Sequence, residues 1–286
     1  MDTITLAGSL EGKLRAVREA GFGQIMISAH DLVEHPGGEA AAASLVRQSG
    51  LRVTGFQVLR DFEGLSGHLH AYKIDIAKAM LGMCRELGSK LLLVCSSTSA
   101  HATGDSEVLA RDLRKLAMLA VPLDIRIAYE ALSWGKRVKE FPQASELVGA
   151  ADSPNLGLAL DAFHLLATKT ELDQLDLVDP QQVFLVQLSD FMWRELPSIE
   201  ERINTARHFR VFPGEGLHGA QVAEFVQRLD EKGYRGDYSF EVFNDDYTQL
   251  PPAVVALRAR QSAKWITDHV SRRSLPLRRP GREARG

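Results

Sequence analysis

The segment LGLALDAFH, residues 156–164, contains an apolar run that ends in Asp161. Three other strand-like segments also end in a residue that can bind a divalent cation: Glu130 in RIAYEA (126–131), Gln187 in VFLVQLSD (183–190) and Glu241 in YSFEVF (238–243). One polar residue at the end of an apolar strand can occur by chance. Four of them in successive strand–helix units predict a (β/α)₈ barrel with a metal site at its mouth.

The rest of the chain alternates strand and helix signals in the way this fold requires. Eight short apolar or β-branched runs occur, at 3–8, 24–29, 52–59, 90–96, 126–131, 156–162, 183–190 and 238–243. Amphipathic helical patterns separate them, and a glycine closes several of these patterns, at Gly21, Gly50, Gly88 and Gly233. A long loop is expected from 191 to about 218. The alternation favours a closed parallel barrel over a doubly wound open sheet.

Length and composition fit one domain. The chain has 286 residues and 45% hydrophobic content, and a single barrel of this kind needs about 250 residues. We therefore expect one catalytic barrel domain over residues 1–271. Residues 272–286 carry six arginines against one glutamate, together with two prolines, and predict a disordered basic tail. The alternative for this tail is contact with nucleic acid or an anionic membrane.

The charge pattern gives no sign of nucleic-acid binding, because the net charge is −3 and basic residues are spread along the chain up to the tail. No secretory signal pattern begins the sequence, and no apolar run has the length of a membrane-spanning helix. Cys84 and Cys95 show no metal-type spacing and are interpreted as reduced core residues. We expect a cytoplasmic protein without nucleic-acid or membrane partners, in which the barrel or its loops would supply the contacts of any homo-oligomer.

The four strand-end residues have a definite chemistry. Three carboxylates and an amide oxygen are hard ligands, suited to one Mg²⁺, Mn²⁺ or Co²⁺ ion with positions open to water or substrate. The alternative is that each acid forms a structural ion pair with an Arg or Lys.

Several longer motifs indicate which family of barrel proteins this sequence resembles. They are RDFEG (60–64), LLLVCSS (91–97), YEALSWGKRV (129–138), LGLALDAFH (156–164), VFLVQLSD (183–190), RHFRVFPGEG (207–216) and YSFEVFND (238–245). In this order they resemble the bacterial 3-dehydroshikimate dehydratases, members of the xylose-isomerase-like TIM-barrel superfamily. The resemblance implies that Glu130, Asp161, Gln187 and Glu241 are metal ligands, and Gln187 stands where many epimerases have a His.

The reaction implied by this resemblance is conversion of 3-dehydroshikimate into protocatechuate with loss of water. It needs a metal ion as Lewis acid and no organic cofactor. We expect His164 to protonate the departing hydroxyl and to titrate near neutrality; its alternative role is a hydrogen bond to a ligand carboxylate. Glu241 is the expected base for the proton α to the ketone, with Glu130 as the alternative.

The substrate carboxylate calls for a guanidinium. Arg210 in the RHFR loop is the first candidate and Arg60 the second, although Arg60 could instead pair with a nearby acid. Arg207, in the same loop as Arg210, is also expected to contact the substrate. Trp134 is expected in the pocket wall, and His70 is either a further substrate contact or an exposed residue at a helix start.

Other functions remain open at this point. A metal-dependent sugar or polyol epimerase-isomerase would keep the same four ligand positions, but a His is expected at position 187. An inosose dehydratase would share the elimination on a neutral polyol. A nuclease of this superfamily needs further His and Asp ligands for three zinc ions, which the sequence does not offer. A non-catalytic barrel that binds a metabolite is the remaining alternative.

Overall fold

The computed structural model describes residues 1–274, with side chains described through residue 270. Seven parallel strands form one curled sheet in the order β1-β2-β3-β4-β5-β6-β9. Their bounds are β1 Gln24–Ser28, β2 Arg52–Arg60, β3 Leu91–Cys95, β4 Arg126–Glu130, β5 Leu156–Asp161, β6 Val183–Leu188 and β9 Asp237–Phe240. The sheet is therefore a nearly closed parallel barrel, as the alternation of strands and helices predicted.

The first two residues fill the eighth position of the barrel. Asp2 N–H donates to the carbonyl of Phe240 in β9 at 3.1 Å, and Met26 N–H in β1 donates to the carbonyl of Met1 at 2.9 Å. The prediction of a strand at 3–8 is wrong, because Thr3–Thr5 forms a 3₁₀ turn, η1. The Asp2 side chain accepts from Ile4 N–H at 3.1 Å and so begins this turn directly after the paired residues.

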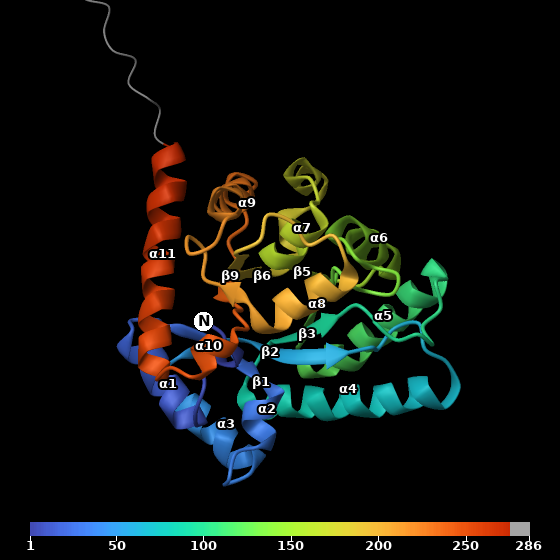
Figure 1. Ribbon diagram of the computed structural model, residues 1–286. Helices are drawn as coiled ribbons and strands as arrows, with labels where there is room; N and C mark the ends of the chain where they lie inside the picture. Colours follow the sequence, from blue (N-terminus) through green and yellow to red (C-terminus); the bar gives the residue numbers. More distant parts are fainter. Residues whose placement is uncertain (275–286) are drawn as a thin grey trace, which may run out of the picture.

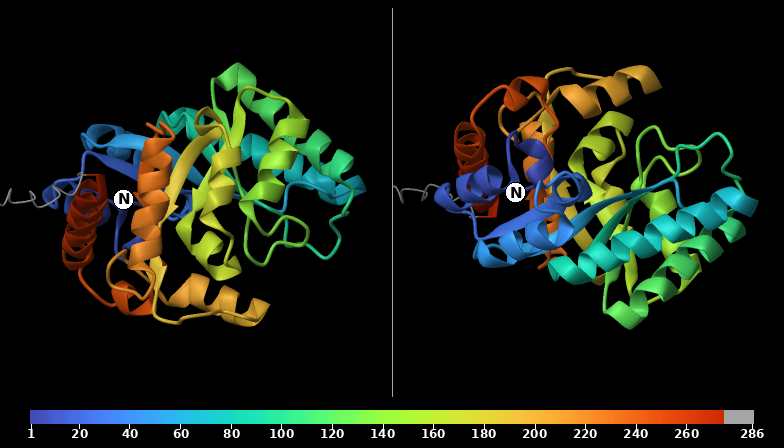
Figure 2. Two further views of the ribbon diagram at one scale, coloured as in Figure 1. Left: turned by 90° about the horizontal axis from the view of Figure 1, so that it is seen from above. Right: turned by 90° about the horizontal axis from the view of Figure 1, so that it is seen from below.

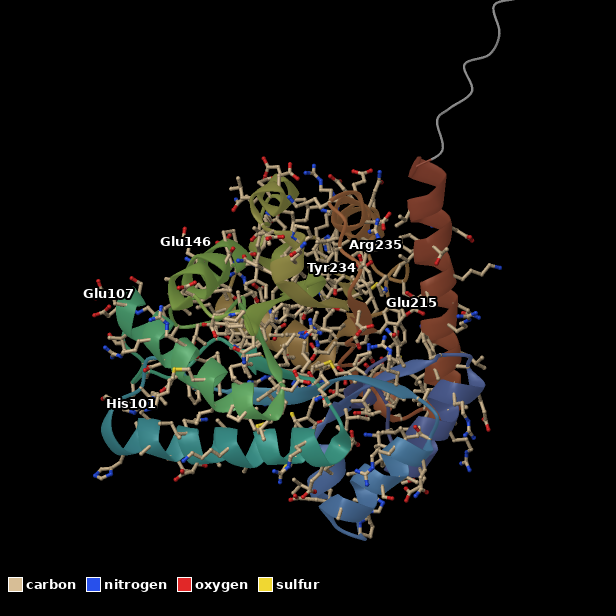
Figure 3. All side chains as sticks on the ribbon, turned by 180° about the vertical axis from the view of Figure 1, so that it is seen from behind. His101, Glu107, Glu146, Glu215, Tyr234 and Arg235 are labelled. Atoms are coloured by element: carbon tan, nitrogen blue, oxygen red, sulfur yellow. The ribbon has the colours of Figure 1, made fainter. Side chains whose placement is uncertain are left out.

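Helices cover the outside of the barrel (Figures 1 and 2). They are α1 Leu10–Glu19, α2 Ala29–Val33, α3 Glu39–Gln48, α4 Gly67–Leu87, α5 Ser106–Ala120, α6 Phe141–Ala151, α7 Ala162–Thr168, α8 Ile199–His208, α9 Gly219–Glu231, α10 Asp245–Thr248 and α11 Pro252–Ser274. Further 3₁₀ turns are η2 Val121–Leu123, η3 Leu172–Leu177 and η4 Pro180–Gln182. Charged side chains such as Glu107 and Glu146 project outward from these helices (Figure 3).

Apolar side chains fill both faces of the sheet. Every residue of β5 and β6 is buried, as expected for parallel strands that lie between a barrel interior and a layer of helices. One buried cluster, which includes Met26, Leu93 and Phe184, is separate from the larger cluster that joins strands and helices. The strand ends can therefore carry polar groups on a rigid support.

The expected loop at 191–218 contains ordered structure instead. A short antiparallel hairpin forms between β7 Asp190–Phe191 and β8 Arg210–Val211, with α8 between the two strands. Phe191 pairs with Arg210 in this hairpin. Because β7 follows β6 closely, the hairpin brings Arg210 to the C-terminal ends of the barrel strands.

At the C-terminus, α11 continues to Ser274, so the first residues of the predicted tail 272–286 are helical. The rest of that prediction lies outside the described residues. Among the described helices, none is both long enough and apolar enough to span a membrane.

Candidate metal centre and active site

The four predicted metal ligands lie at the same edge of the barrel. Glu130 and Asp161 are the last residues of β4 and β5, Gln187 is the penultimate residue of β6, and Glu241 directly follows β9. Asp161 and Gln187 are register partners in neighbouring strands. The carboxyl ends of parallel strands meet at one face, so these side chains converge although they are far apart in sequence.

All four side chains are almost fully buried: the exposed fractions are 3% for Glu130, 1% for Asp161, 0% for Gln187 and 6% for Glu241. Ligand atoms of Glu130, Asp161 and His164 lie within 4.8 Å of one another. Oε1 of Glu130 has no hydrogen-bond partner among the described residues. The Gln187 amide makes no hydrogen bond of good geometry there either, although it lies close enough to Glu241 to oppose the increase that burial causes in the pKa of that carboxyl. Buried polar atoms without partners are rare, and a cation bound between them would satisfy them.

The electrostatics also favour a bound cation. Burial raises the pKa of Glu130 well above its usual range, and the charges of Glu241 and Asp161 raise it further. Burial raises the pKa of Asp161 and of Glu241 too, although the Arg210 guanidinium opposes both increases. Because the carboxylates outnumber this one guanidinium, their ionised forms need another positive charge. The residues present therefore fit a divalent metal ion.

His164 lies beside these carboxylates in a defined tautomer. Its Nδ1 accepts from the backbone N–H of Ser133 at 3.1 Å, and its Nε2 lies 3.7 Å from both Glu130 Oε1 and Asp161 Oδ2. A backbone N–H can only donate, so Nδ1 carries no hydrogen and the hydrogen of the neutral ring is on Nε2. Burial, and then the charge of Arg210, lower the pKa of His164 well below 6.5. The expectation that it titrates near neutrality is therefore not met.

Arg210 lies among the expected ligands. Its Nη1 is 2.6 Å from Asp161 Oδ2 and 3.1 Å from Glu241 Oε2, and the side chain is only 3% exposed. The guanidinium also packs on the Phe163 ring at 4.5 Å. This residue is predicted as a clamp for the substrate carboxylate, but in the structure its charge is engaged by Asp161 and Glu241, two of the expected ligands.

A cavity of about 320 Å³ opens beside the cluster. Its lining includes Glu130, Glu241, His164, Arg210, Arg60, Arg207, Trp134 and Cys95. The ring of Trp134 packs edge-on against His164, with ring centroids 5.0 Å apart. The cavity thus gathers the two carboxylates predicted as alternative bases, the histidine predicted as the acid and all three predicted arginines.

Arg60 and Arg207 contribute charge that no acid neutralises directly. Both residues are exposed, and neither guanidinium makes a hydrogen bond or ion pair with a described residue. The acids that could have paired with Arg60 have other partners: Asp61 accepts from Thr98 N–H at 2.7 Å, and Glu63 accepts from the Tyr129 hydroxyl at 2.8 Å. Two guanidinium groups therefore remain for an anionic ligand.

His70 lies outside this lining. It is on α4, where its ring packs against Phe62 and its Nε2 is 3.9 Å from Asp112 Oδ1. Sequence reasoning missed Cys95, which lines the cavity and contacts Glu130, whereas Cys84 lies in the core as expected. The strand-end rule that predicted the four ligands could have found it, because Cys95 is the last residue of β3.

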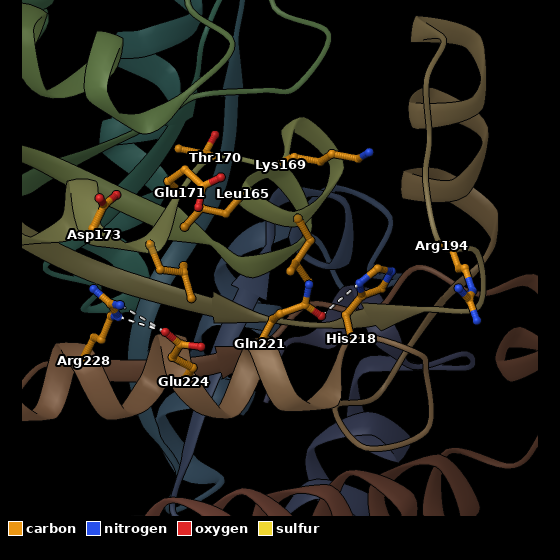
Figure 4. Close-up of a pocket in the computed structure, with 12 residues that line it drawn as sticks. Leu165, Lys169, Thr170, Glu171, Asp173, Arg194, His218, Gln221, Glu224 and Arg228 are labelled. Carbon is orange, nitrogen blue, oxygen red and sulfur yellow. Dashed lines mark hydrogen bonds and ion pairs between the residues drawn. The ribbon is translucent and has the colours of Figure 1, made fainter.

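A second cavity, of about 470 Å³, lies on the outer wall beside α7 and α9 (Figure 4). Within its lining Arg228 pairs with Glu224, and His218 Nδ1 contacts Gln221 Oε1 at 3.3 Å, whereas Lys169 pairs with Glu195 outside the lining. None of the predicted site residues lines it. The predicted site residues therefore gather at the cavity at the strand ends, not at this one.

Comparisons with known proteins agree with this architecture. A family model described as a xylose isomerase-like TIM barrel matches residues 14–269. The 3-dehydroshikimate dehydratase of Pseudomonas aeruginosa is 36% identical over 266 residues, which cover 93% of this chain and 41% of that protein. The 3-dehydroshikimate dehydratase of Neurospora crassa is 26% identical over 322 residues, which cover 91% of this chain and 89% of that protein.

One similar solved structure is a xylose isomerase-like TIM barrel/4-hydroxyphenylpyruvate dioxygenase fusion protein. It matches with a TM-score of 0.88 and 34% identity over 95% of this chain and 43% of the fusion protein. The chain thus spans less than half of the Pseudomonas relative and of the fusion protein, but corresponds to most of the Neurospora relative.

Proposed function

This chain belongs to the xylose isomerase-like TIM barrel family, and from that premise we propose that it is a metal-dependent dehydratase that converts 3-dehydroshikimate into protocatechuate. The observation that carries the proposal is the cavity itself. It places two unpaired guanidinium groups, Arg60 and Arg207, beside a buried carboxylate cluster and a neutral histidine. The similarity to dehydratases, one of them comparable in length, supports the same substrate.

The proposed metal ligands are Glu130, Asp161, Gln187 and Glu241, and the ion is Mg²⁺, Mn²⁺ or Co²⁺. Bound there, the ion would supply Lewis-acid catalysis at the substrate ketone. Burial of the ligands keeps bulk water from competing for the ion. No organic cofactor is part of the proposal.

The proton transfers are assigned to side chains that line the cavity. Glu241 removes the proton from the carbon α to the ketone, with Glu130 as the alternative base. The hydroxyl leaves as water after it receives a proton, and the proton that Glu241 has taken from the α carbon supplies it. The Nε2–H of the neutral His164 ring donates a hydrogen bond to the departing hydroxyl. Loss of one water molecule and a proton shift give the aromatic ring.

Substrate orientation depends on the cationic side of the cavity. Arg60 and Arg207 bind the substrate carboxylate, and Trp134 forms the apolar wall beside His164. Arg210 faces the same cavity, but its Nη1 is held by Asp161 and Glu241. A neutral sugar or inosose would leave both free guanidinium groups unused, which favours the carboxylated substrate. A cytoplasmic location is proposed as well, because both cysteines are free.

The experiment is ultraviolet-monitored formation of protocatechuate by metal-stripped protein, with and without added Mg²⁺ or Mn²⁺. We expect product only with metal, and no product from the Glu241→Gln variant. A bound metal without product would refute the substrate assignment; inosose and ketose substrates should then be tested on the same protein. No reaction with any of these substrates would favour a non-catalytic barrel.

A further inference from the structure

Cys95 is the last residue of β3 and lies directly beside a predicted metal ligand. It is the register partner of Glu130 in β4, and the backbone N–H of the next residue, Ser96, donates to the Glu130 carbonyl at 2.8 Å. The side chain of Cys95 lines the cavity, although only 5% of the residue is exposed. Main-chain bonds therefore fix the thiol next to the Glu130 carboxylate.

The two oxygens of that carboxylate have different surroundings. Oε2 lies 2.9 Å from Cys95 Sγ, which places it in hydrogen-bond contact with the thiol. Oε1 is buried without a hydrogen-bond partner and lies 3.7 Å from His164 Nε2. Oε1 is thus the oxygen directed toward the other ligand atoms of Asp161 and His164.

We propose that Cys95 is a positioning residue for the metal centre: its S–H donates to Oε2 of Glu130 and fixes the carboxylate so that Oε1 alone binds the ion. The inference rests on the metal site of the proposed function but not on the identity of the substrate. Hydrogen bonds to a ligand carboxylate restrict its rotation, and removal of such partners typically weakens metal binding about 10- to 100-fold.

Burial favours this role over packing alone. A thiol is a weak donor, but a carboxylate is a strong acceptor, and here water is excluded from the contact. No other described residue donates a hydrogen bond to either side-chain oxygen of Glu130. Loss of the thiol would therefore leave both oxygens without a donor and the carboxylate free to rotate.

The test is titration of metal-stripped protein with Mn²⁺, in which the electron paramagnetic resonance signal of the free ion gives the dissociation constant. Cys95→Ala should weaken Mn²⁺ binding about tenfold or more, while Cys95→Ser should restore much of the affinity because a hydroxyl also donates. Cys84→Ala is the matched control, since Cys84 is the other thiol and lies in the apolar core. Unchanged Mn²⁺ affinity in a folded Cys95→Ala variant would overturn the proposal.

A second readout observes the hydrogen bond itself. In the Cys84→Ala protein, Cys95 is the only remaining thiol, so its S–H stretching band can be assigned by infrared spectroscopy. In metal-loaded protein the band should move to higher wavenumber when Glu130→Gln is added, because a neutral amide accepts more weakly than the carboxylate that the bound cation keeps ionised. An unmoved band would contradict the bond.

These outcomes separate the two proposals. Wild-type protein that binds Mn²⁺ but forms no protocatechuate would refute the substrate and leave the role of Cys95 intact. Wild-type protein that binds no Mn²⁺ would refute both the metal site and the role of Cys95 in it.

Discussion

Nη1 of Arg210 lies 2.6 Å from Oδ2 of Asp161, inside the cluster of side chains expected to bind the metal. Its contact with Glu241 Oε2 at 3.1 Å makes the guanidinium a shared counter-charge for two buried carboxylates. These ion pairs exist because the β7–β8 hairpin carries Arg210 to the strand ends. Metal binding and protein stability should therefore depend on each other at this residue.

Arg210→Met should destabilise the metal-free protein by about 3–5 kcal/mol, because it leaves buried carboxylates without their counter-charge. Added Mn²⁺ should recover a large part of this loss. Urea unfolding with and without metal measures both effects. Arg60→Met is the control: Arg60 is exposed and has no ion pair, so the free energy of unfolding should change by less than about 0.5 kcal/mol. Equal stability of metal-free Arg210→Met and wild type would contradict the counter-charge role.

Gln187→Leu should weaken metal binding without loss of metal-free stability. Gln187 is fully buried, and its amide makes no hydrogen bond of good geometry. Its one polar contact is with Glu241, where it opposes the increase in pKa that burial causes. An apolar side chain of similar size therefore removes a poorly satisfied group of a kind that costs about 1–3 kcal/mol. Mn²⁺ titration and urea unfolding measure the two quantities.

The comparison for this variant is Gln57→Leu, at another buried glutamine. Gln57 donates to Asp2 Oδ2 at 2.8 Å, so its loss should lower metal-free stability. If both variants destabilise the protein equally, Gln187 has structural partners and is not reserved for a metal.

The convergence of the four candidate ligands could be predicted from sequence because the strand-end rule is local: an apolar run defines a strand, and the residues at its end lie at the barrel mouth. Glu130 and Asp161 are the last residues of their strands, and Gln187 and Glu241 lie within one residue of the ends of theirs. The strand predicted at 3–8 lies too far along the chain, because Met1 and Asp2 make the barrel pairing with β1 and β9. The Asp2 side chain then caps the 3₁₀ turn Thr3–Thr5, so the apolar run after it forms no strand.

The surroundings of Arg210 could not be predicted in the same way. They depend on the pairing of Phe191 with Arg210, and α8 separates these two residues in the sequence. The two strands are too short to show an alternating pattern that would indicate the pairing. His70 illustrates the same limit, because its helix directs it toward Asp112 and away from the cavity. Contacts made by loops are non-local, so motif spacing alone does not define them.

His164→Ala should reduce kcat at least about 100-fold while Mn²⁺ affinity remains close to that of wild type. The reason is that Nε2 carries the only ring hydrogen, since Nδ1 accepts from Ser133 N–H. Steady-state kinetics and Mn²⁺ titration of the same preparation separate the effects. Loss of Mn²⁺ binding in this variant would make His164 a metal ligand, in agreement with its position among the clustered ligand atoms.

Arg60→Met and Arg207→Met should each raise KM about tenfold or more, because a hydrogen bond between charged groups contributes about 1.5–3 kcal/mol. Neither change should weaken Mn²⁺ binding, since neither guanidinium is paired with a proposed ligand and the charge of Arg60 acts on Glu241 only at a distance. Arg194→Met is the control, because Arg194 lines the outer cavity. The same KM for wild type and both cavity variants would remove the arginines as carboxylate contacts.

Glu63 offers a prediction about pH outside the metal ligands. It is 2% exposed, and burial raises its pKa above the ordinary value of 4.5 despite donation from Ser97 N–H. A carboxyl group with a raised pKa in the folded state binds its proton more tightly there than in the unfolded chain. Its contribution to stability is complete below pH 4.5 and is lost as the pH rises through the raised pKa.

Glu63→Gln removes this titration but keeps an oxygen that can accept from Ser97 and Tyr129. The free energy of unfolding of wild type minus that of the variant should therefore fall as the pH rises from about 4.5 toward neutrality. Urea unfolding over a pH series measures it, with Glu146→Gln on the exposed face of α6 as the control. A difference that stays constant with pH would mean that Glu63 has the same pKa in the folded and unfolded states, and that its hydrogen bonds compensate fully for burial.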